Sequence, residues 1–189
     1  GVGDDRRRMI EREVKLSFSS AEDARAAVQA TGASLVRARR LQDDALLDTP
    51  KGRLRRRGCA LRIRVEAGHS RLTFKGPVTP GTMKVRDEHE TLVGEGEAVT
   101  RILEGLGLRV WFRYQKYREE YTTNGVIVAI DETPVGTFVE LEGHEDGILA
   151  LTAALGRTPA DFIVDSYRKL FVKHRDTHGL AQTDMLFPE

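Results

Sequence analysis

Three charged residues at alternate positions, Glu11, Glu13 and Lys15, lie near the start of the chain. On a β-strand, side chains two residues apart share one face of the sheet. This face would carry two carboxylates and an ammonium group, while Val14 and Leu16 would offer apolar surface on the other face. Carboxylate oxygens are the ligands that hard divalent cations such as Mg²⁺ and Mn²⁺ prefer. The segment therefore predicts a strand that could bind a cation beside a positive charge.

Charged residues recur in phase along most of the other predicted strands. The basic ones are Lys15, Arg62, Arg64, Lys75, Arg86, Lys116 and Arg118. The acidic ones are Glu11, Glu13, Glu88, Glu90, Asp131, Glu140 and Glu142. Arginine binds phosphate oxygens through paired hydrogen bonds, and lysine supplies a point charge. Together with carboxylates that suit divalent cations, these residues predict a site for a polyphosphate held with metal ions.

Alternating charge is also typical of the solvent-exposed face of an antiparallel sheet, and periodicity alone leaves that alternative open. Three features favour an enclosed charged face. The face is rich in Arg and Glu but poor in Ser, Thr, Asn and Gln, and its acids occur in pairs two residues apart. The predicted helices are also numerous enough to cover the apolar face. Burying these charges is costly unless ion pairs or a ligand compensate them.

Periodicity and turn signals predict one domain over residues 9–179, built of strands that are mostly joined as hairpins. Predicted strands cover residues 9–18, 37–49, 60–66, 71–75, 82–92, 109–122, 126–131 and 137–142. Predicted helices begin at Ser19, lie within residues 94–107 and 146–155, and run from Thr158 to about His174. Eight antiparallel strands can close into a barrel. We therefore expect an α+β fold, with residues 1–8 as a disordered leader or an expression remnant and 180–189 as a loose tail.

Composition limits the classes of function. The 30 Lys and Arg residues nearly balance the 29 Asp and Glu residues, whereas a nonspecific nucleic-acid binder carries a larger basic excess. The single cysteine, Cys59, excludes an intrachain disulfide and a multi-cysteine zinc site, and the five histidines have no ligand-like spacing. No apolar run approaches the length of about 20 residues that spans a bilayer. We expect a cytoplasmic protein that binds neither nucleic acid nor membrane.

Several of these segments resemble the CYTH superfamily, the triphosphate tunnel metalloenzymes. Glu11-Arg-Glu-Val-Lys15 resembles the family signature Glu-x-Glu-x-Lys. Further matches follow in the family's order: Leu61-Arg-Ile-Arg64, Leu72-Thr-Phe-Lys-Gly76, Arg86-Asp-Glu-His-Glu90, Lys116-Tyr-Arg118, Asp131, Gly136-Thr-Phe-Val-Glu-Leu-Glu142 and Ser166-Tyr167. The chain departs from the family pattern at Leu47, where an aromatic residue often precedes the aspartate that is Asp48 here.

The resemblance implies a barrel that is open as a tunnel, with helices outside it. It implies that a triphosphate is bound by Lys15, Arg62, Arg64, Lys75, Arg86, Lys116 and Arg118. It implies that Mg²⁺ or Mn²⁺ is bound by Glu11, Glu13, Asp131, Glu140 and Glu142, with Glu88 and Glu90 as a second acidic cluster. Glu11, Glu13, Glu140 and Glu142 would then be the catalytic residues.

The leading functional hypothesis is a metal-dependent hydrolase of inorganic triphosphate, thiamine triphosphate or a nucleoside triphosphate. The alternative is a class IV adenylate cyclase, which would convert ATP to cyclic AMP and pyrophosphate in the same tunnel. A noncatalytic polyphosphate-binding barrel is a third hypothesis, but it would not require the acidic residues. We interpret Trp111 and Phe112 as packing residues, with stacking at the tunnel mouth as the alternative. The partner is a small-molecule triphosphate, and a homodimer is left open.

Overall fold

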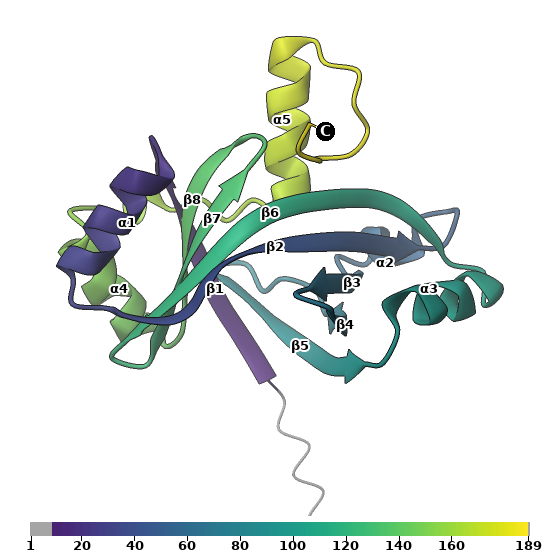
Figure 1. Ribbon diagram of the computed structural model, residues 1–189, viewed down its shortest axis with the longest axis horizontal. Coiled ribbons are helices and arrows are strands. Elements are labelled where there is room, and N and C mark those ends of the chain that lie inside the picture. Colours follow the sequence, from purple (N-terminus) through teal and green to yellow (C-terminus); the bar gives the residue numbers. More distant parts are fainter. Residues whose placement is uncertain (1–8, 189) are drawn as a thin grey trace, which may run out of the picture.

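A computed structural model describes residues 9–188 and contains eight antiparallel strands that close into a barrel (Figure 1). The order around the barrel is β1-β5-β4-β3-β2-β6-β7-β8, and β8 pairs back with β1. The strands are β1 (Met9–Phe18), β2 (Ser34–Asp48), β3 (Ala60–Glu66), β4 (His69–Lys75), β5 (Lys84–Val93), β6 (Arg109–Thr123), β7 (Val126–Thr133) and β8 (Gly136–Glu142). The helices are α1 (Ala21–Ala30), α2 (Arg53–Arg56), α3 (Gly96–Gly105), α4 (Glu145–Ala154), the 3₁₀ helix η1 (Pro159–Asp161) and α5 (Tyr167–His178). The expected barrel with external helices is confirmed.

The main hydrophobic core lies outside the barrel wall and includes residues of helices α1 and α4, which are both found at the same end of the barrel in Figure 1. Val14 and Leu16 of β1 pack there with Val28 of α1 and Ile148 of α4. Because successive side chains on a strand point to opposite faces, the charged neighbours of Val14 and Leu16 point into the barrel. The apolar core and the polar interior therefore lie on opposite faces of the same wall.

A second apolar cluster joins α5 and the C-terminal segment to β6. Phe112 and Tyr114 of β6 pack with Phe171 of α5 and with Met185, which is fully buried. The Met185 amide donates to the Arg113 carbonyl at 3.0 Å, and its carbonyl accepts from the Gln115 amide at 2.8 Å. The expectation of a loose tail is thus wrong around Met185, while the predicted leader, residues 1–8, lies outside the described residues.

The helix predicted from Thr158 to about His174 is divided into two pieces. Only η1 follows Thr158, and the chain then runs alongside β1, where the amide and carbonyl of Ile163 exchange hydrogen bonds of 2.9 and 3.0 Å with Lys15. A backbone used in this bridge cannot also continue a helix. Ser166 then caps α5 by accepting from the Lys169 amide at 3.3 Å. The bridge places the start of α5 beside Lys15.

The N-cap of α1 is Ser20 rather than the predicted Ser19, because the Ser20 hydroxyl accepts from the Asp23 amide at 3.0 Å.

Among the residues from 9 to 188, no helix is long and apolar enough to cross a membrane.

Candidate active site

A cavity of about 660 Å³ occupies the barrel and is lined by most of the predicted charged residues. These are Glu11, Glu13, Lys15, Arg62, Arg64, Lys75, Arg86, Glu88, Glu90, Lys116, Arg118, Glu140 and Glu142. A second cavity of about 450 Å³ shares Arg64 and Glu90 with the first. The charged face is therefore enclosed, and the alternative of a solvent-exposed charged face is wrong.

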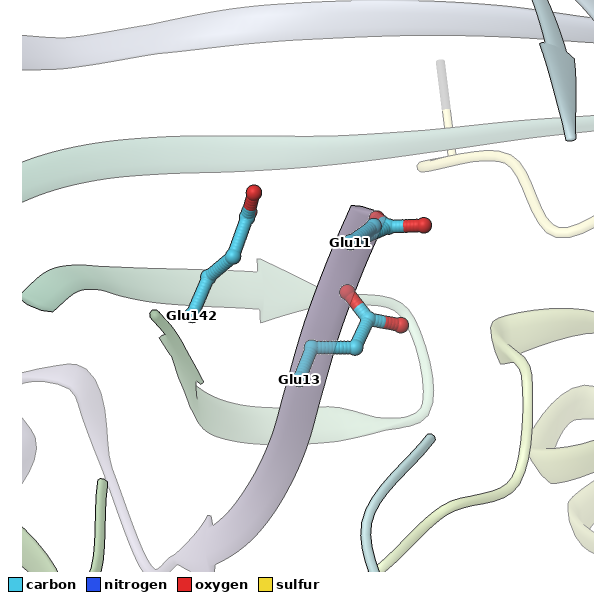
Figure 2. A group of neighbouring side chains, drawn as sticks. All are labelled: Glu11, Glu13 and Glu142. Atoms are coloured by element: carbon cyan, nitrogen blue, oxygen red, sulfur yellow. The ribbon is translucent and has the colours of Figure 1, made fainter. Parts of the chain in front are cut away.

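Three glutamates from two adjacent strands form a compact acidic group in this cavity. Glu11 and Glu13 project from β1, and Glu142 lies at the end of β8, which pairs with β1 so that Glu142 is opposite Glu13 (Figure 2). One carboxylate oxygen from each of the three residues lies within 4.8 Å of the others. Oxygens at this spacing could share one hard divalent cation.

Burial and mutual repulsion perturb the ionisation of these carboxylates. Burial, together with the charges of Glu13 and Glu88, raises the pKa of Glu11 to about 7 even though Lys75 is close. Burial and the charges of Glu11, Glu13 and Glu140 raise the pKa of Glu142 to about 7. Burial would also raise the pKa of Glu13, but the neighbouring lysines Lys15, Lys84 and Lys75 lower it to about 2.

The acidic group fits a divalent cation for a second reason. The Oε2 atom of Glu11 is buried and has no hydrogen-bond partner among the described residues. A buried acceptor without a partner is destabilising, and a cation would satisfy it. The donor set of three carboxylates suits Mg²⁺ or Mn²⁺ better than a softer metal.

The raised pKa values predict how stability depends on pH without metal. A carboxyl whose folded pKa lies above its unfolded value binds protons more tightly in the folded state, so stability falls as pH rises. We expect the metal-free protein to lose about 5 kcal/mol, roughly half from each carboxyl, between about pH 4.5 and about pH 7, the span of the shifts at Glu11 and Glu142. Urea unfolding across this window measures the change.

Magnesium should restore stability mainly at the upper end of the window, because a carboxylate must be deprotonated to bind a metal. Glu142→Gln is the matched variant and should show a smaller loss. An unfolding free energy that rises with pH across this range would contradict the raised pKa values of Glu11 and Glu142. An equal stabilisation by magnesium at the low and high ends of the range would contradict metal binding by these carboxylates.

The basic lining is partly paired with the acidic group. Lys75 contacts Glu11 at 2.5 Å and Glu88 at 3.0 Å, whereas Lys84 contacts Glu13 at 2.9 Å. Arg62 is held more loosely, because its nearest carboxylate oxygens, on Glu90 and Asp44, are 3.6 and 3.8 Å away. The Nε atom of Arg62 is buried without a hydrogen-bond partner in the described part of the chain. Arg62 donates through Nη2 to the Thr73 hydroxyl at 3.3 Å, and its Nε retains unused donor capacity within the described chain.

Arg86 uses its guanidinium differently from the other predicted cations. Its Nε donates to the Gly76 carbonyl at 2.9 Å, and its Nη2 lies 3.3 Å from the Gly58 carbonyl and 3.4 Å from that of Lys75. These contacts tie the loops beside β3 and β4 to β5. Its expected contact with a triphosphate stays a prediction.

Asp131 lies in a separate buried network. Its carboxylate accepts two hydrogen bonds of 2.6 Å from Arg118, one of 2.9 Å from Lys116 and one of 2.5 Å from the Tyr167 hydroxyl. Among the described residues, it is absent from both the acidic group and the lining of the cavity. The observed contacts use both Asp131 oxygens to position Lys116 and Arg118, and the metal-binding role implied for Asp131 stays a prediction.

Glu140 occupies an intermediate place between this network and the acidic group. It lines the cavity, but its oxygens lie 3.0 Å from Arg118 and 3.7 Å from Lys15. Its expected role as a metal ligand stays a prediction. Its observed contacts hold the side chains of Arg118 and Lys15 in position.

Among the described residues, Asp44 and Lys84 are charged residues of the interior that were missing from the predicted set. Asp44 of β2 is fully buried and accepts from Arg64 at 2.7 and 3.0 Å. Lys84 lines the cavity and contacts Glu13. Lys84 has the same parity as Arg86, and Asp44 the same parity as Gln42 and Asp48, so strand periodicity carried the signal for both.

Trp111 and Phe112, both interpreted from the sequence as packing residues, differ in their surroundings. Trp111 lines the cavity, whereas Phe112 is buried in the cluster under α5. Leu47, the departure from the family pattern, is buried in the wall. The following residue, Asp48, accepts from the backbone amides of Thr49, Leu54 and Arg55 and thereby fixes the short loop that contains α2.

Comparisons with known proteins identify the family of this chain. The model of the CYTH domain family matches residues 9–157. A relative named "Putative adenylate cyclase" from Methanocaldococcus jannaschii is 29% identical over 135 residues, covering 71% of this chain and 77% of the relative.

Solved structures show the same fold. A structure described as a "putative adenylate cyclase" of Vibrio parahaemolyticus has a TM-score of 0.77 at 19% identity, over 87% of this chain and 98% of the other. A Hippeastrum protein, described as a "putative adenylyl cyclase" with a dominant triphosphatase activity, has a TM-score of 0.65 at 20% identity, over 92% and 97% of the two chains. With the family model covering most of its length, this chain belongs to the CYTH domain family.

Proposed function

We propose that this protein is a metal-dependent hydrolase of triphosphate compounds. The observation that carries the proposal is that three glutamates within 4.8 Å of one another face the same cavity as a set of lysines and arginines. The cavity thus offers one region for a divalent cation and a neighbouring region for an elongated polyanion. Membership of the CYTH family and the triphosphatase activity attributed to the Hippeastrum protein support the proposal.

In the proposed reaction, water attacks the terminal phosphorus and the bridging oxygen leaves with the diphosphate. Phosphoryl transfer depends mainly on alignment and on neutralisation of charge. Arg62 and Lys116 would align the triphosphate through its oxygens, and Lys75 would stabilise the charge nearest the acidic group. Asp131 and Glu140 would keep Lys116 and Arg118 in place before the substrate arrives.

Glu11, Glu13 and Glu142 would hold Mg²⁺ or Mn²⁺ in this scheme. When bound there, the cation would neutralise phosphoryl oxygens and lower the pKa of a bound water molecule.

Parallel incubations with tripolyphosphate, thiamine triphosphate and ATP, each with magnesium or manganese, test the proposal. Metal-dependent release of orthophosphate is the expected result. Cyclic AMP and pyrophosphate formed from ATP would establish the cyclase alternative instead. Binding without turnover of any of the three compounds would favour a noncatalytic barrel and contradict the proposal.

Replacement of Arg62 by Ala should weaken the binding of tripolyphosphate by about tenfold or more, because a hydrogen bond to a charged group contributes about 1.5–3 kcal/mol. Arg62 is suited to this role because its Nε has no partner in the described chain. Titration calorimetry without divalent metal measures the affinity directly.

Arg113→Ala is the matched control. Arg113 lies on the outer face of β6 and contacts Asp43 at 3.1 Å, so its loss should leave tripolyphosphate binding unchanged. Equal affinities of the wild-type protein and the Arg62 variant would refute the role of Arg62.

A further inference from the structure

A strongly basic segment borders the mouth of the cavity. Residues 51–57 have the sequence Lys-Gly-Arg-Leu-Arg-Arg-Arg, with five cationic residues and no acidic one, although the whole chain has a net charge of only +1. All five cationic residues are exposed, and Arg55 lines the cavity. We call these five residues, together with Arg168 of α5, the basic rim.

The basic rim is organised around Trp111. The guanidinium carbon of Arg55 lies 4.0 Å from the centre of the Trp111 ring system, and that of Arg168 lies 5.6 Å from it. Arg168 also lies 5.0 Å from the ring centre of Phe112 and, like Arg55, lines the cavity. Residues far apart in the sequence therefore bring two guanidinium groups to one aromatic side chain at the mouth.

The positive charge of the rim is poorly compensated. Within residues 9–188, Arg55 is the one rim residue that forms an ion pair, with its Nε 3.1 Å from Asp48. That carboxylate already accepts three backbone amides. The Nε and Nη1 atoms of Arg168 are buried and have no hydrogen-bond partner among the described residues. Burial, followed by the charges of Arg175 and Arg55, lowers the pKa of Arg168, as expected where cations lack counter-charge.

Arginines with unused donors bind phosphate oxygens well, and aromatic faces can hold guanidinium groups in place. The rim continues directly into the cavity, because Arg55 and Arg168 share that cavity with the lysines and arginines of the barrel. An anionic chain longer than the barrel site would therefore meet the rim as it leaves the mouth.

We propose that the basic rim binds the phosphoryl units of a linear inorganic polyphosphate that extend beyond the triphosphate held in the barrel. This inference rests on the proposed function and names a substrate class for the same site: polyphosphates with more than three phosphoryl units. RNA bearing a 5′-triphosphate fits less well, because single-stranded nucleic acid is bound largely by stacking of bases on aromatic faces. The ring of Trp111 is already in contact with two guanidinium groups.

Binding of tripolyphosphate and of long-chain polyphosphate, measured by calorimetry without divalent metal, tests the inference independently of turnover. The variants are Arg168→Gln and the exposed pair Arg53→Gln with Arg57→Gln, and the control is Arg101→Gln on the exposed face of α3. We expect Arg168→Gln to lower the ratio of polyphosphate affinity to tripolyphosphate affinity by about tenfold. The double variant should also lower the ratio, and the control should leave it unchanged.

An unchanged ratio in both folded rim variants would overturn the inference, as would an equal loss in Arg101→Gln. An oligoribonucleotide with a 5′-triphosphate that competes better than polyphosphate, and loses as much affinity in the rim variants, would also overturn it. If tripolyphosphate is hydrolysed but the rim variants keep the wild-type affinity ratio, this inference is wrong and the proposed function stands. If the rim variants lower the affinity for polyphosphate but no triphosphate is hydrolysed, the proposed function is wrong and the binding of polyphosphate by the rim stands.

Discussion

Replacement of Glu142 by Gln should reduce metal-dependent hydrolysis of tripolyphosphate by about 100-fold or more, because it removes one of the three carboxylates of the acidic group. The fold should remain intact. Glu142 forms no ion pair in the described part of the chain, so its loss leaves no cation unpaired. Its raised pKa shows that its charge is disfavoured in the folded protein without metal. The unfolding free energy should therefore stay the same or increase.

Orthophosphate release over a range of magnesium and manganese concentrations measures this effect. Glu145→Gln is the matched control, since Glu145 is exposed at the start of α4 and outside the acidic group. Full activity of a folded Glu142 variant at the same metal concentration would exclude Glu142 as a ligand. Activity that returns at high metal concentration would identify weakened metal binding as the cause of the loss.

Replacement of Asp131 by Asn should destabilise the protein by about 3–5 kcal/mol. Asp131 is fully buried and is the shared partner of Lys116, Arg118 and the Tyr167 hydroxyl. The amide has nearly the same shape but no charge, so two buried cations would lose their principal counter-ion. Urea unfolding of the metal-free protein measures the loss.

Glu132→Gln, at the position next to Asp131 on β7, is the control for the loss of one carboxylate from this strand. Glu132 points to the opposite face and pairs with the partly exposed Arg39, and such pairs contribute about 0–1 kcal/mol. A loss below about 1 kcal/mol for the Asp131 variant would contradict the assignment of Asp131 as the centre of a structural network.

Strand parity made most of the site predictable. The two-residue period of a strand depends only on local backbone geometry, so the inward face could be deduced for Glu11, Glu13 and Lys15 without knowledge of the fold. The same parity in β3 and β8 placed Arg62 and Glu140 correctly in the cavity. The resemblance to the family then supplied the barrel closure, which parity alone does not determine.

Strand parity indicates the face on which a side chain lies but not which residues contact it, so the partners of Asp131 could not be predicted. Asp131 points inward as expected, yet Lys116 and Arg118 from the adjacent β6 and Tyr167 from α5 occupy its oxygens. Those contacts join segments far apart in the sequence. The basic rim was missed for a related reason, since Arg168 meets Arg55 only after α5 packs on β6.

The errors at the C-terminal end have the same origin in tertiary contacts. Thr158 and Pro159 are good helix-start residues, but the bridge between Ile163 and Lys15 ends the helical turn after Asp161. Met185 is held because β6 offers free backbone groups and an apolar pocket beside Tyr114. The local sequence around residues 158–163 does not reveal the pairing of Ile163 with Lys15, and the local sequence around Met185 does not reveal the apolar pocket beside Tyr114.

A crystal structure with manganese and a nonhydrolysable triphosphate analogue tests the central claim most directly. We predict an anomalous manganese peak among the carboxylates of Glu11, Glu13 and Glu142, with the phosphoryl oxygens contacting Arg62, Lys75 and Lys116. Manganese bound elsewhere, or an analogue seated outside the barrel while the cavity holds only water, would contradict it.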